Sequence, residues 1–233
     1  MRKARLLLAD DHAIFLEGLT RLLEPEYEVI GKAEDGRAML ELSARLKPDV
    51  IIADISMPLL SGIEAVRQLR KKDCRTKVIF LSMHSDVELA SQAIRLGASG
   101  YVLKHSAAES LSRAIREVLN GRVYVSPRIS VDVLSTVQQT SRHPEQPAVV
   151  LTQREREVLQ LVSEGRTIRG IANILDIAGR TVVFHKSNLM DKLGLRTTAE
   201  LTRYAFQSGL LAPQESEAVF HHPTVAARRA MHA

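Results

Sequence analysis

Apolar residues gather in five short runs in the first half of the chain, and they recur at helical spacing between the runs. Several runs are apolar at every position, which is typical of strands buried on both faces of a parallel sheet. The predicted strands are "ARLLLAD" (4–10), "YEVIGKA" (27–33), "DVIIAD" (49–54), "KVIFLS" (77–82) and "GYVLK" (100–104). Because strand and helix alternate five times, the pattern predicts an α/β fold, with a five-stranded doubly wound parallel sheet over residues 1–121.

The segments between these runs also carry helix signals. The sides expected to be buried are those of Ile14, Leu19, Leu22 and Leu23 in the first helix and of Leu111, Ile115, Val118 and Leu119 in the last. Three serines precede a glutamate by three residues, as in a capping box, where hydroxyl and carboxylate each bond a free backbone amide. These pairs are Ser61 with Glu64, Ser85 with Glu88, and Ser106 with Glu109.

The pattern changes after the sheet. Residues 126–150 are rich in Ser, Gln and Pro and show little periodicity after Leu134, so we expect a short helix at most within a flexible linker, residues 122–148. From residue 151 the pattern is helical only, which predicts an all-α domain over residues 149–212. The tail, residues 213–233, is expected to be disordered.

Four helices account for the C-terminal domain: 153–164, 168–175, 180–193 and 198–208. Two of them begin with a capping box, formed by Thr152 with Glu155 and by Thr197 with Glu200. Glycines stand where helices should end, at Gly165, Gly194 and Gly209.

Composition narrows the class of protein. The hydrophobic content of 45% supports a sizeable core, and the single cysteine excludes an internal disulfide. No apolar run is long enough for a membrane span, so we expect a soluble, cytoplasmic protein. Residues 149–213 carry nine Lys and Arg against six Asp and Glu, whereas residues 1–121 carry 18 against 17. The mild positive bias of the C-terminal part permits a nucleic-acid partner there.

Charged side chains end several of the predicted strands. Asp10 and Asp11 follow the first strand, and Asp54 ends the third. Ligands of doubly wound sheets bind beyond the carboxyl ends of the strands, so these three carboxylates would meet if the first and third strands are neighbours. Crowded carboxylates repel, and a hard cation such as Mg²⁺ would relieve the repulsion.

Ser82 and Lys104 end the fourth and fifth strands and would join the same edge. The set suits phosphoryl transfer to a carboxylate, with an ammonium group and a cation neutralising the phosphoryl oxygens. Each residue alone has a plainer explanation, since a strand-terminal Asp often caps a turn and a strand-terminal Lys is usually solvated. The coincidence of five such residues favours the functional interpretation.

The motifs "LLLADDH", "PDVIIADISMPLLSGIEA", "VIFLSMHSD" and "GASGYVLKHSAAESL" resemble the flavodoxin-like receiver domain of two-component response regulators. The resemblance spans about residues 4–121. It implies that Asp54 is the phospho-acceptor, that Asp10, Asp11 and the backbone carbonyl of Ser56 help to bind Mg²⁺, and that a sensor histidine kinase is the donor. It further implies that Ser82 and Tyr101 form a switch pair and that Lys104 contacts the phosphate. Without the resemblance, Tyr101 would be read as ordinary core or edge packing.

In the C-terminal domain, a short helix, a tight link and a longer helix have the shape of a helix-turn-helix. On helix 180–193, Val182, Leu189 and Leu193 share one face and should pack inward. We expect phosphate contacts from Arg180, Thr181, Lys186 and Lys192 and base contacts from Val183, Phe184 and Ser187. A plain helical bundle with a solvated basic face would show the same spacing.

The motifs "LTQREREVLQLV", "RTV" and "TTAELTRYA" resemble the LuxR-type output domain of the NarL/FixJ class, over residues 149–212. Three positions depart from the family pattern, Gly170, Ala178 and Val183, and they put the operator sequence and the affinity in doubt. The resemblance implies that helix 198–208 forms the dimer contact on DNA. Packing of Leu201, Tyr204 and Ala205 on the other helices is the alternative.

These features predict a transcription regulator, not an enzyme. Phosphorylation of Asp54 is expected to release or dimerise the C-terminal domain on two-fold DNA. An aspartyl-phosphate hydrolase is the first alternative, but it needs a second Asp at position 56, where this chain has Ser56. A protein-interaction adaptor that no longer binds DNA is the second, and it would draw on Gly170 and Val183.

Overall fold

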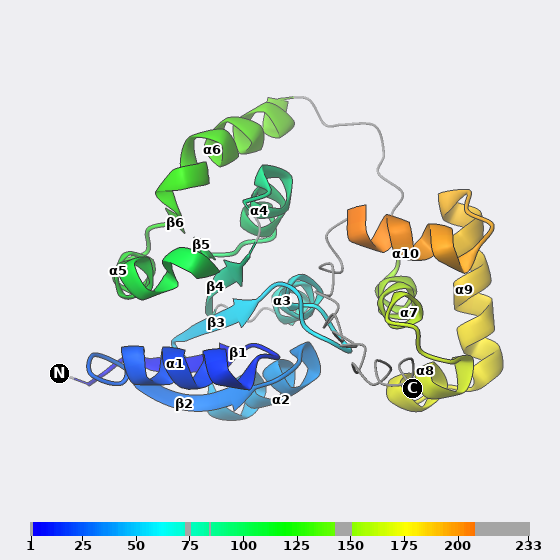
Figure 1. Cartoon of the computed structure of the whole chain (residues 1–233), viewed down its shortest axis with the longest axis horizontal. Helices are drawn as coiled ribbons and strands as arrows, with labels where there is room; N and C mark the ends of the chain where they lie inside the picture. Colours follow the sequence, from blue (N-terminus) through cyan, green and yellow to red (C-terminus); the bar gives the residue numbers. More distant parts are fainter. Residues whose placement is uncertain (1, 73–75, 84, 143–150, 208–233) are drawn as a thin grey trace, which may run out of the picture.

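The chain folds into an α/β domain followed by a helical domain that lies against it (Figure 1). The computed structural model describes residues 2–72, 76–83, 85–142 and 151–207, without the side chains of 138–142 and 207. Gly209 and the predicted disordered tail lie outside the described residues. Among those described, no helix combines the length and apolarity that a membrane crossing requires.

The α/β domain is built on a parallel sheet of six strands in the order β2-β1-β3-β4-β5-β6. The strands are β1 (Arg5–Ala9), β2 (Glu28–Ala33), β3 (Val50–Asp54), β4 (Lys77–Ser82), β5 (Gly100–Leu103) and β6 (Tyr124–Val125). The first five confirm the predicted strands. The sheet has one further strand, β6, which is only two residues long and pairs with β5 at the edge.

Helices cover both faces of the sheet. On one face lie α1 (Ala13–Leu23) and α5 (Ala107–Leu119), and on the other lie α2 (Gly36–Leu46), α3 (Gly62–Lys71) and α4 (Val87–Arg95). Along β1, Leu6 and Leu8 join the core under α1 and α5, while Leu7 joins the core on the opposite face. Burial on both faces explains why β1, β3, β4 and β5 are apolar at most positions.

The predicted inner side of α1 was partly wrong. Leu19 and Leu23 are buried, but Ile14 is 90% exposed and Leu22 is 37% exposed. Leu16 takes the inward position, so the stripe runs at three- and four-residue intervals from Leu16. At the end of α5, Leu119 is likewise more exposed than predicted, whereas the other three predicted positions of that helix are buried.

Two of the helix caps predicted in the α/β domain, Ser85 and Ser106, were wrong. Asp86, not Ser85, caps α4 and accepts hydrogen bonds from the amides of Glu88 and Leu89. The hydroxyl of Ser106 donates to the carbonyl of Leu103 and caps nothing, because a short 3₁₀ turn, η1 (Lys104–Ser106), precedes α5.

Only one of the two hydrogen bonds of the third predicted capping box, Ser61 with Glu64, is present. The hydroxyl of Ser61 accepts from the amide of Glu64 at 3.4 Å. The carboxylate of Glu64 instead pairs with Arg67 and Arg156. An ion pair with the C-terminal domain has therefore replaced the second half of the box.

The expectation of a short helix at most was also wrong, because helix α6 (Pro127–Arg142) is 16 residues long. Residues 143–148 of the predicted linker lie outside the described residues. Ile129 and Val133 are buried against α4, with Val137 packed beside them, so one apolar stripe recurs every four residues. Pro127 stands at the first helical position, where its missing amide costs nothing.

The C-terminal domain contains α7 (Gln153–Ser163), α8 (Ile168–Leu175), α9 (Gly179–Leu193) and α10 (Thr198–Gln207), as predicted within one or two residues. Both predicted capping boxes are present, at Thr152 with Glu155 and at Thr197 with Glu200. Gly165 and Gly194 have φ of 77° and 66° at helix ends, a conformation that glycine adopts without strain.

Two of the three departures from the family pattern have structural consequences. Ala178 is the N-cap of α9 and makes no side-chain cap bond, which a Ser at that position would supply. Gly170 lies in the first turn of α8 and not in its interior, and its amide donates to the hydroxyl of Thr167 at 3.1 Å.

Gly62 sets how closely α3 approaches the end of β3. A Cβ at this position would lie 2.0 Å from the carbonyl oxygen of Asp54, a distance that forces the backbone apart. We expect Gly62→Ala to reduce the free energy of unfolding by about 1–3 kcal/mol in urea titrations. The control is Gly18→Ala on the exposed side of α1, where nothing outside the helix lies within 4 Å and a gain of about 1 kcal/mol is expected. Equal effects of the two substitutions would contradict this account.

Candidate functional site

The order of the strands brings the predicted acidic residues together. Because β1 and β3 are neighbours, Asp10 and Asp54 lie at the same edge of the sheet. The Nζ atom of Lys104 lies 2.7 Å from Asp10 Oδ2 and 2.9 Å from Asp54 Oδ2. All three side chains are at most 7% exposed. The predicted convergence of these residues is therefore confirmed.

Asp11 and His12 form the outer rim of this acidic pocket. His12 Nδ1 lies 3.0 Å from an oxygen of Asp10 and 3.0 Å from an oxygen of Asp11. One ligand atom from each of Asp10, Asp11, His12 and Asp54 can be chosen so that all lie within 4.8 Å of one another. His12 was not among the predicted site residues, although it directly follows the acidic pair.

The donor set fits a divalent cation. Asp10 Oδ2 is buried and has no hydrogen bond of good geometry among the described residues, so the ammonium of Lys104 is its main charge compensation. The carboxylate oxygens of Asp10, Asp11 and Asp54 are hard ligands, and one side of the pocket is open at the exposed Asp11. The acidic pocket is consistent with a divalent-metal site.

Burial and charge act against each other on the buried ionisable groups. Burial raises the pKa of the Asp54 carboxyl above its ordinary value, and although the charge of Lys104 opposes this rise, it does not cancel it. For Lys104, burial alone would lower the pKa, but the charges of Asp54 and Asp10 outweigh it, and the pKa is raised. The pocket therefore holds a firmly charged ammonium beside a carboxylate whose ionised form is disfavoured.

Ser82 and Tyr101, the predicted switch pair, lie on the adjacent strands β4 and β5. Both are buried, at 3% and 0% exposed, and they share a side-chain hydrogen bond. Burial raises the pKa of Tyr101 to about 12, so its hydroxyl is neutral at physiological pH. The side chain of Tyr101 already points into the domain in this structure, as part of the core beside Phe80 and Leu103.

Helix α9 presents the predicted base-contacting side chains outward. Val183 and Phe184 are 52% and 60% exposed, and Ser187 and Arg180 are also exposed. On the inner face, Val182 and Leu189 are fully buried and Leu193 packs beside them, as predicted. In Figure 1, α9 lies on the far side of α7 from the sheet, so the α/β domain does not cover this surface.

The side chains predicted to contact phosphate differ in their exposure and in the partners they have here. Thr181 is only half-exposed. Lys186 donates to the hydroxyl of Thr198 at 3.0 Å, and Lys192 lies 2.8 Å from the carboxylate of Glu155. These two lysines therefore connect α9 to α10 and to α7 in this structure, whereas Arg180 is exposed.

On α10, Leu201 and Ala205 are fully buried in the core of the C-terminal domain, and Tyr204 packs against it. The predicted packing of these residues is confirmed, and the dimer contact of helix 198–208, which is compatible with it, stays a prediction.

Sequence reasoning missed a set of polar residues on α7. Glu157 and Gln160 are 4% and 1% exposed, although the stretch "REREVLQLVSE" reads as a solvated helix. Their partners, Gln68 and the loop after Asp54, belong to the α/β domain. No signal in the sequence distinguishes these buried polar side chains from solvated ones, because the partners that satisfy them lie in the other domain.

Comparison with known families agrees with this geometry. The family model of the response regulator receiver domain matches residues 6–116, and that of bacterial regulatory proteins of the luxR family matches residues 149–205. The transcriptional regulatory protein DegU of Brevibacillus brevis is 34% identical over 223 residues, which cover 89% of this chain and 94% of DegU. The oxygen regulatory protein NreC of Staphylococcus aureus is also 34% identical, over 89% of this chain and 99% of NreC.

Solved structures give the same result. The two-component response regulator RcsB in complex with DNA is 27% identical, with a TM-score of 0.54, over 90% of this chain and all of RcsB. A LuxR-family response regulator from Aurantimonas is 37% identical with a TM-score of 0.55, over 57% of this chain and 97% of that one. A further RcsB structure holds two dimers bound to two parallel DNAs.

Proposed function

Because the chain belongs to the DNA-binding two-component response regulators, which regulate transcription and are not enzymes, we propose that Asp54 is its phospho-acceptor. The observation that carries the proposal is the contact of Lys104 with both Asp10 and Asp54 at the edge of the sheet. A carboxylate nucleophile, an adjacent carboxylate and a buried ammonium are the groups that phosphoryl transfer to aspartate requires. The receiver family implies a kinase as the donor, and we propose a sensor histidine kinase.

We assign Mg²⁺ to the acidic pocket. Asp10, Asp11 and Asp54 would hold it with their carboxylates, and the backbone carbonyl of Ser56 is the proposed fourth protein ligand. When bound, the cation would neutralise phosphoryl oxygens. Lys104 holds a permanent positive charge at the same place, and the amide of Ser56 donates to the Asp54 carboxylate, which orients it.

Ser82 and Tyr101 are proposed to respond to the phosphoryl group. The hydroxyl of Ser82 ends β4 beside the pocket and can donate to a phosphoryl oxygen. Since it shares a hydrogen bond with Tyr101, a new partner for Ser82 alters the bonding of Tyr101 as well. Because Tyr101 is already buried and points inward here, the change proposed for Tyr101 is one of bonding and not of position.

For DNA recognition we propose that α9 enters the major groove, with Val183, Phe184 and Ser187 on base edges and Arg180 on phosphate. Thr181, Lys186 and Lys192 are proposed to contact the backbone after exchanging or sharing their present partners. RcsB is seen as dimers on DNA, and a homodimer on activation is proposed here.

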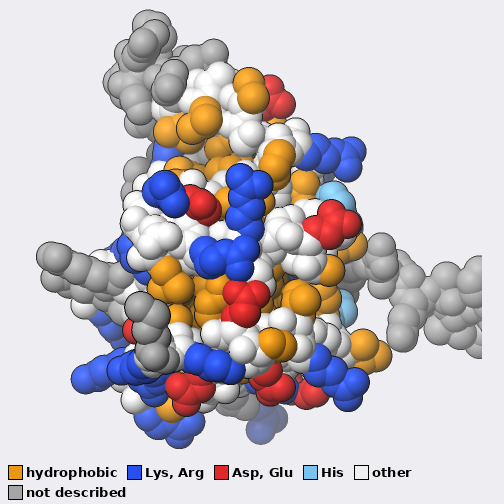
Figure 2. Space-filling view, turned by 90° about the vertical axis from the view of Figure 1, so that its left-hand side faces the viewer, with side chains coloured by type: hydrophobic (Ala, Val, Ile, Leu, Met, Phe, Trp, Pro, Cys, Tyr) orange, Lys and Arg blue, Asp and Glu red, His pale blue; other side chains and the backbone are white. Residues whose placement is uncertain are grey.

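The domain boundaries are proposed as 1–121 for the receiver, 122–148 for the linker with β6 and α6, and 149–212 for the DNA-binding domain. Figure 2 shows the side of the receiver that faces away from the DNA-binding domain, where hydrophobic side chains are exposed among basic and acidic ones. This side is open to a kinase or a second receiver while the two domains are docked. A DNA target is consistent with the predicted cytoplasmic location.

Labelling of the protein by a small phosphodonor such as acetyl phosphate should depend on a divalent cation. Asp11 is the most exposed of the three proposed carboxylate ligands, so Asp11→Asn removes a ligand with little effect on the core. We expect this change to weaken Mg²⁺ binding in calorimetric titrations by roughly tenfold or more, which corresponds to about 1.4 kcal/mol.

Asp132→Asn, at an exposed position of α6, is the matched control and should bind Mg²⁺ like the wild type. Labelling that survives excess EDTA, or equal Mg²⁺ binding by both variants, would rule out the proposed metal site.

A further inference from the structure

We infer that the loop after Asp54, residues 55–61, couples the two domains: helix α7 holds it in a strained shape, so that domain docking opposes any rearrangement of the phosphorylation site. The inference deepens the proposed function and depends on Asp54 as the phospho-acceptor. It assigns a regulatory role to Gln160 and Glu164, which lie one turn apart on α7.

The first observation is a set of hydrogen bonds from these two side chains to the backbone of the loop. The Oε1 atom of Gln160 accepts from the amide of Ser61 at 2.8 Å, and its Nε2 donates to the carbonyl of Met57 at 3.0 Å. Glu164 Oε1 accepts from the amide of Leu59 at 3.0 Å and from Gln160 Nε2 at 2.9 Å. Because Gln160 is 1% exposed, water cannot easily replace these bonds while the domains are docked.

The second observation is strain at Leu59. Its φ of 64° places it in the left-handed region, which a residue with a branched side chain rarely adopts. Its side chain packs against the hydrophobic core of the DNA-binding domain, and its amide is the one that Glu164 binds. The loop itself closes a tight turn around Leu59, because the amide of Leu60 donates to the carbonyl of Pro58 at 2.7 Å, and the contacts from the DNA-binding domain further hold this conformation. Strain of this kind is often found at switch regions.

The receiver holds both ends of the same loop by hydrogen bonds. The amide of Gly62 donates to the carbonyl of Ile55 at 2.9 Å, and the amide of Gly36 donates to the carbonyl of Leu60 at 3.1 Å. Between these two ends, the backbone groups of Met57 and Leu59 are hydrogen-bonded to side chains of α7. Since the amide of Ser56 bonds the carboxylate of Asp54, only a few covalent bonds separate the phospho-acceptor from the residues that α7 holds.

The rest of the interface is built for reversible docking. Arg156 pairs with Glu64 at 2.5 Å, and Glu157 accepts from Gln68 at 3.0 Å. Each of these buried carboxylates also has a partner in its own domain, Arg67 for Glu64 and Arg154 for Glu157. Separation of the domains would therefore leave neither carboxylate without a positively charged partner.

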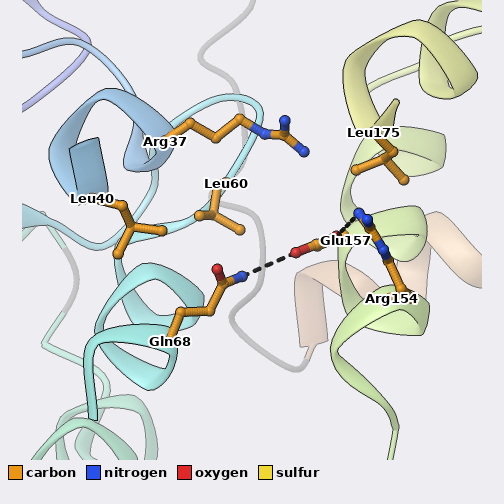
Figure 3. A pocket seen from close by; sticks show the side chains of 7 residues that line it. All are labelled: Arg37, Leu40, Leu60, Gln68, Arg154, Glu157 and Leu175. Carbon is orange, nitrogen blue, oxygen red and sulfur yellow. Dashed lines mark hydrogen bonds and ion pairs between the residues drawn. The ribbon is translucent and has the colours of Figure 1, made fainter. Parts of the chain in front are cut away.

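The interface is also incompletely packed. A cavity of about 280 Å³ lies between the domains, with Arg37 reaching into it from the receiver and Arg154 and Leu175 facing it from α7 and α8 (Figure 3). A polar interface with such a gap holds domains together less firmly than a continuous apolar core does.

Docking in this form leaves the outward face of α9 exposed, so it does not act by covering the recognition helix. What it restrains is the loop beside Asp54. If docking favours one shape of the loop and phosphorylation favours another, then loss of the α7 contacts must make phosphorylation more favourable, because coupling between two sites is reciprocal.

The test uses the full-length protein with Gln160→Ala. Amide hydrogen exchange of Leu59 and Ser61, followed by mass spectrometry, reports the hold on the loop, and labelling by acetyl phosphate in Mg²⁺ reports the phosphorylation site. We expect both the exchange of these amides and the initial rate of labelling to increase about five-fold or more. The control is Gln153→Ala on the same helix, which loses hydrogen bonds to Glu157 and to Lys71 of the receiver but none to the loop, so both quantities should stay within about two-fold of the wild type.

Two outcomes would overturn the inference: unchanged protection of the loop amides in Gln160→Ala, or faster amide exchange with no change in labelling. Absence of label on wild-type Asp54 would contradict the proposed function itself, which is a separable result.

A pair of variants isolates the strain. Leu59→Ala and Leu59→Gly both lose the packing on the DNA-binding domain, but only glycine adopts the left-handed conformation freely. We expect the loop amides of the Ala variant to exchange about five-fold faster than those of the Gly variant. Equal exchange in the two variants would show that α7 holds no strained conformation.

Discussion

Asp54→Asn should abolish the incorporation of a phosphoryl group from acetyl phosphate. The reason is chemical, because an amide cannot form the acyl phosphate, and geometric, because Asp54 is the carboxylate that Lys104 and the amide of Ser56 orient within the pocket. We expect residual labelling below about 1% of the wild type, a loss equivalent to at least about 2.7 kcal/mol in the barrier. Mass spectrometry of the intact protein measures the added phosphoryl mass.

The matched control is Asp49→Asn, an Asp-to-Asn change immediately before the same strand, where the side chain is 43% exposed. It should label like the wild type. Full labelling of the Asp54→Asn protein, or a labelled peptide that does not contain residue 54, would overturn the assignment.

The same variant should be more stable than the wild type in the absence of phosphorylation. The raised pKa of Asp54 means that its ionised form is disfavoured by folding, so the charge costs stability at neutral pH. This cost is relieved as the pH falls through the raised pKa, and it vanishes below the ordinary value of 3.8, where both states are protonated. We expect a higher Tm for Asp54→Asn at pH 7 and a smaller difference at low pH, whereas Lys104 retains Asp10 as its partner in the variant.

The pocket could be predicted from the sequence because few rules fix it. Asp10, Asp54 and Lys104 each stand at the carboxyl end of an apolar run, and parallel strands align those ends. Only one further condition was needed, namely that β1 and β3 are neighbours, and the sheet fulfils it. Local signals were sufficient here because the position of each side chain depends only on the end of the strand that carries it.

Elements that depend on tertiary contacts were harder to predict. Strand β6 has two residues and no pattern of its own, and α6 is a helix whose apolar stripe is explained by its packing on α4. The cap of α4 moved by one residue because Asp86 competes with Ser85 for the same amides. In each case neighbouring alternatives of similar local preference were decided by packing or by a competing side chain.

The interface between the domains could not be predicted for a different reason. Gln160 and Glu164 lie on a helix rich in charge, and a buried polar side chain reads like a solvated one until its partner is known. The same ambiguity concerned the lysines of α9, since Lys192 is bound to Glu155 within the domain. Arg180, Val183 and Phe184 remain exposed, and we therefore propose that they have the most direct role in DNA recognition.

Arg180→Ala and Phe184→Ala should therefore weaken DNA binding in two distinguishable ways. Arg180 stands in the first turn of α9 and is proposed to contact phosphate, so its loss should lower affinity for every duplex by roughly tenfold and reduce the slope of log K against log salt by about one. Phe184 is 60% exposed and is proposed to contact base edges, so its loss should reduce the preference for the selected sequence. The double variant should lose roughly 100-fold or more, if the two effects are additive.

The measurement is fluorescence anisotropy of the phosphorylated full-length protein on a duplex that the wild type selects from random sequence, with a scrambled duplex for comparison, at several salt concentrations. Arg128→Ala removes an exposed positive charge from α6 and serves as the control, since it leaves α9 intact. Wild-type affinity, salt slope and selectivity in both α9 variants would mean that another surface binds DNA. A lower salt slope with unchanged selectivity in Arg180→Ala, together with lost selectivity in Phe184→Ala, would assign positioning to one residue and base reading to the other, because only base contacts distinguish one duplex from another.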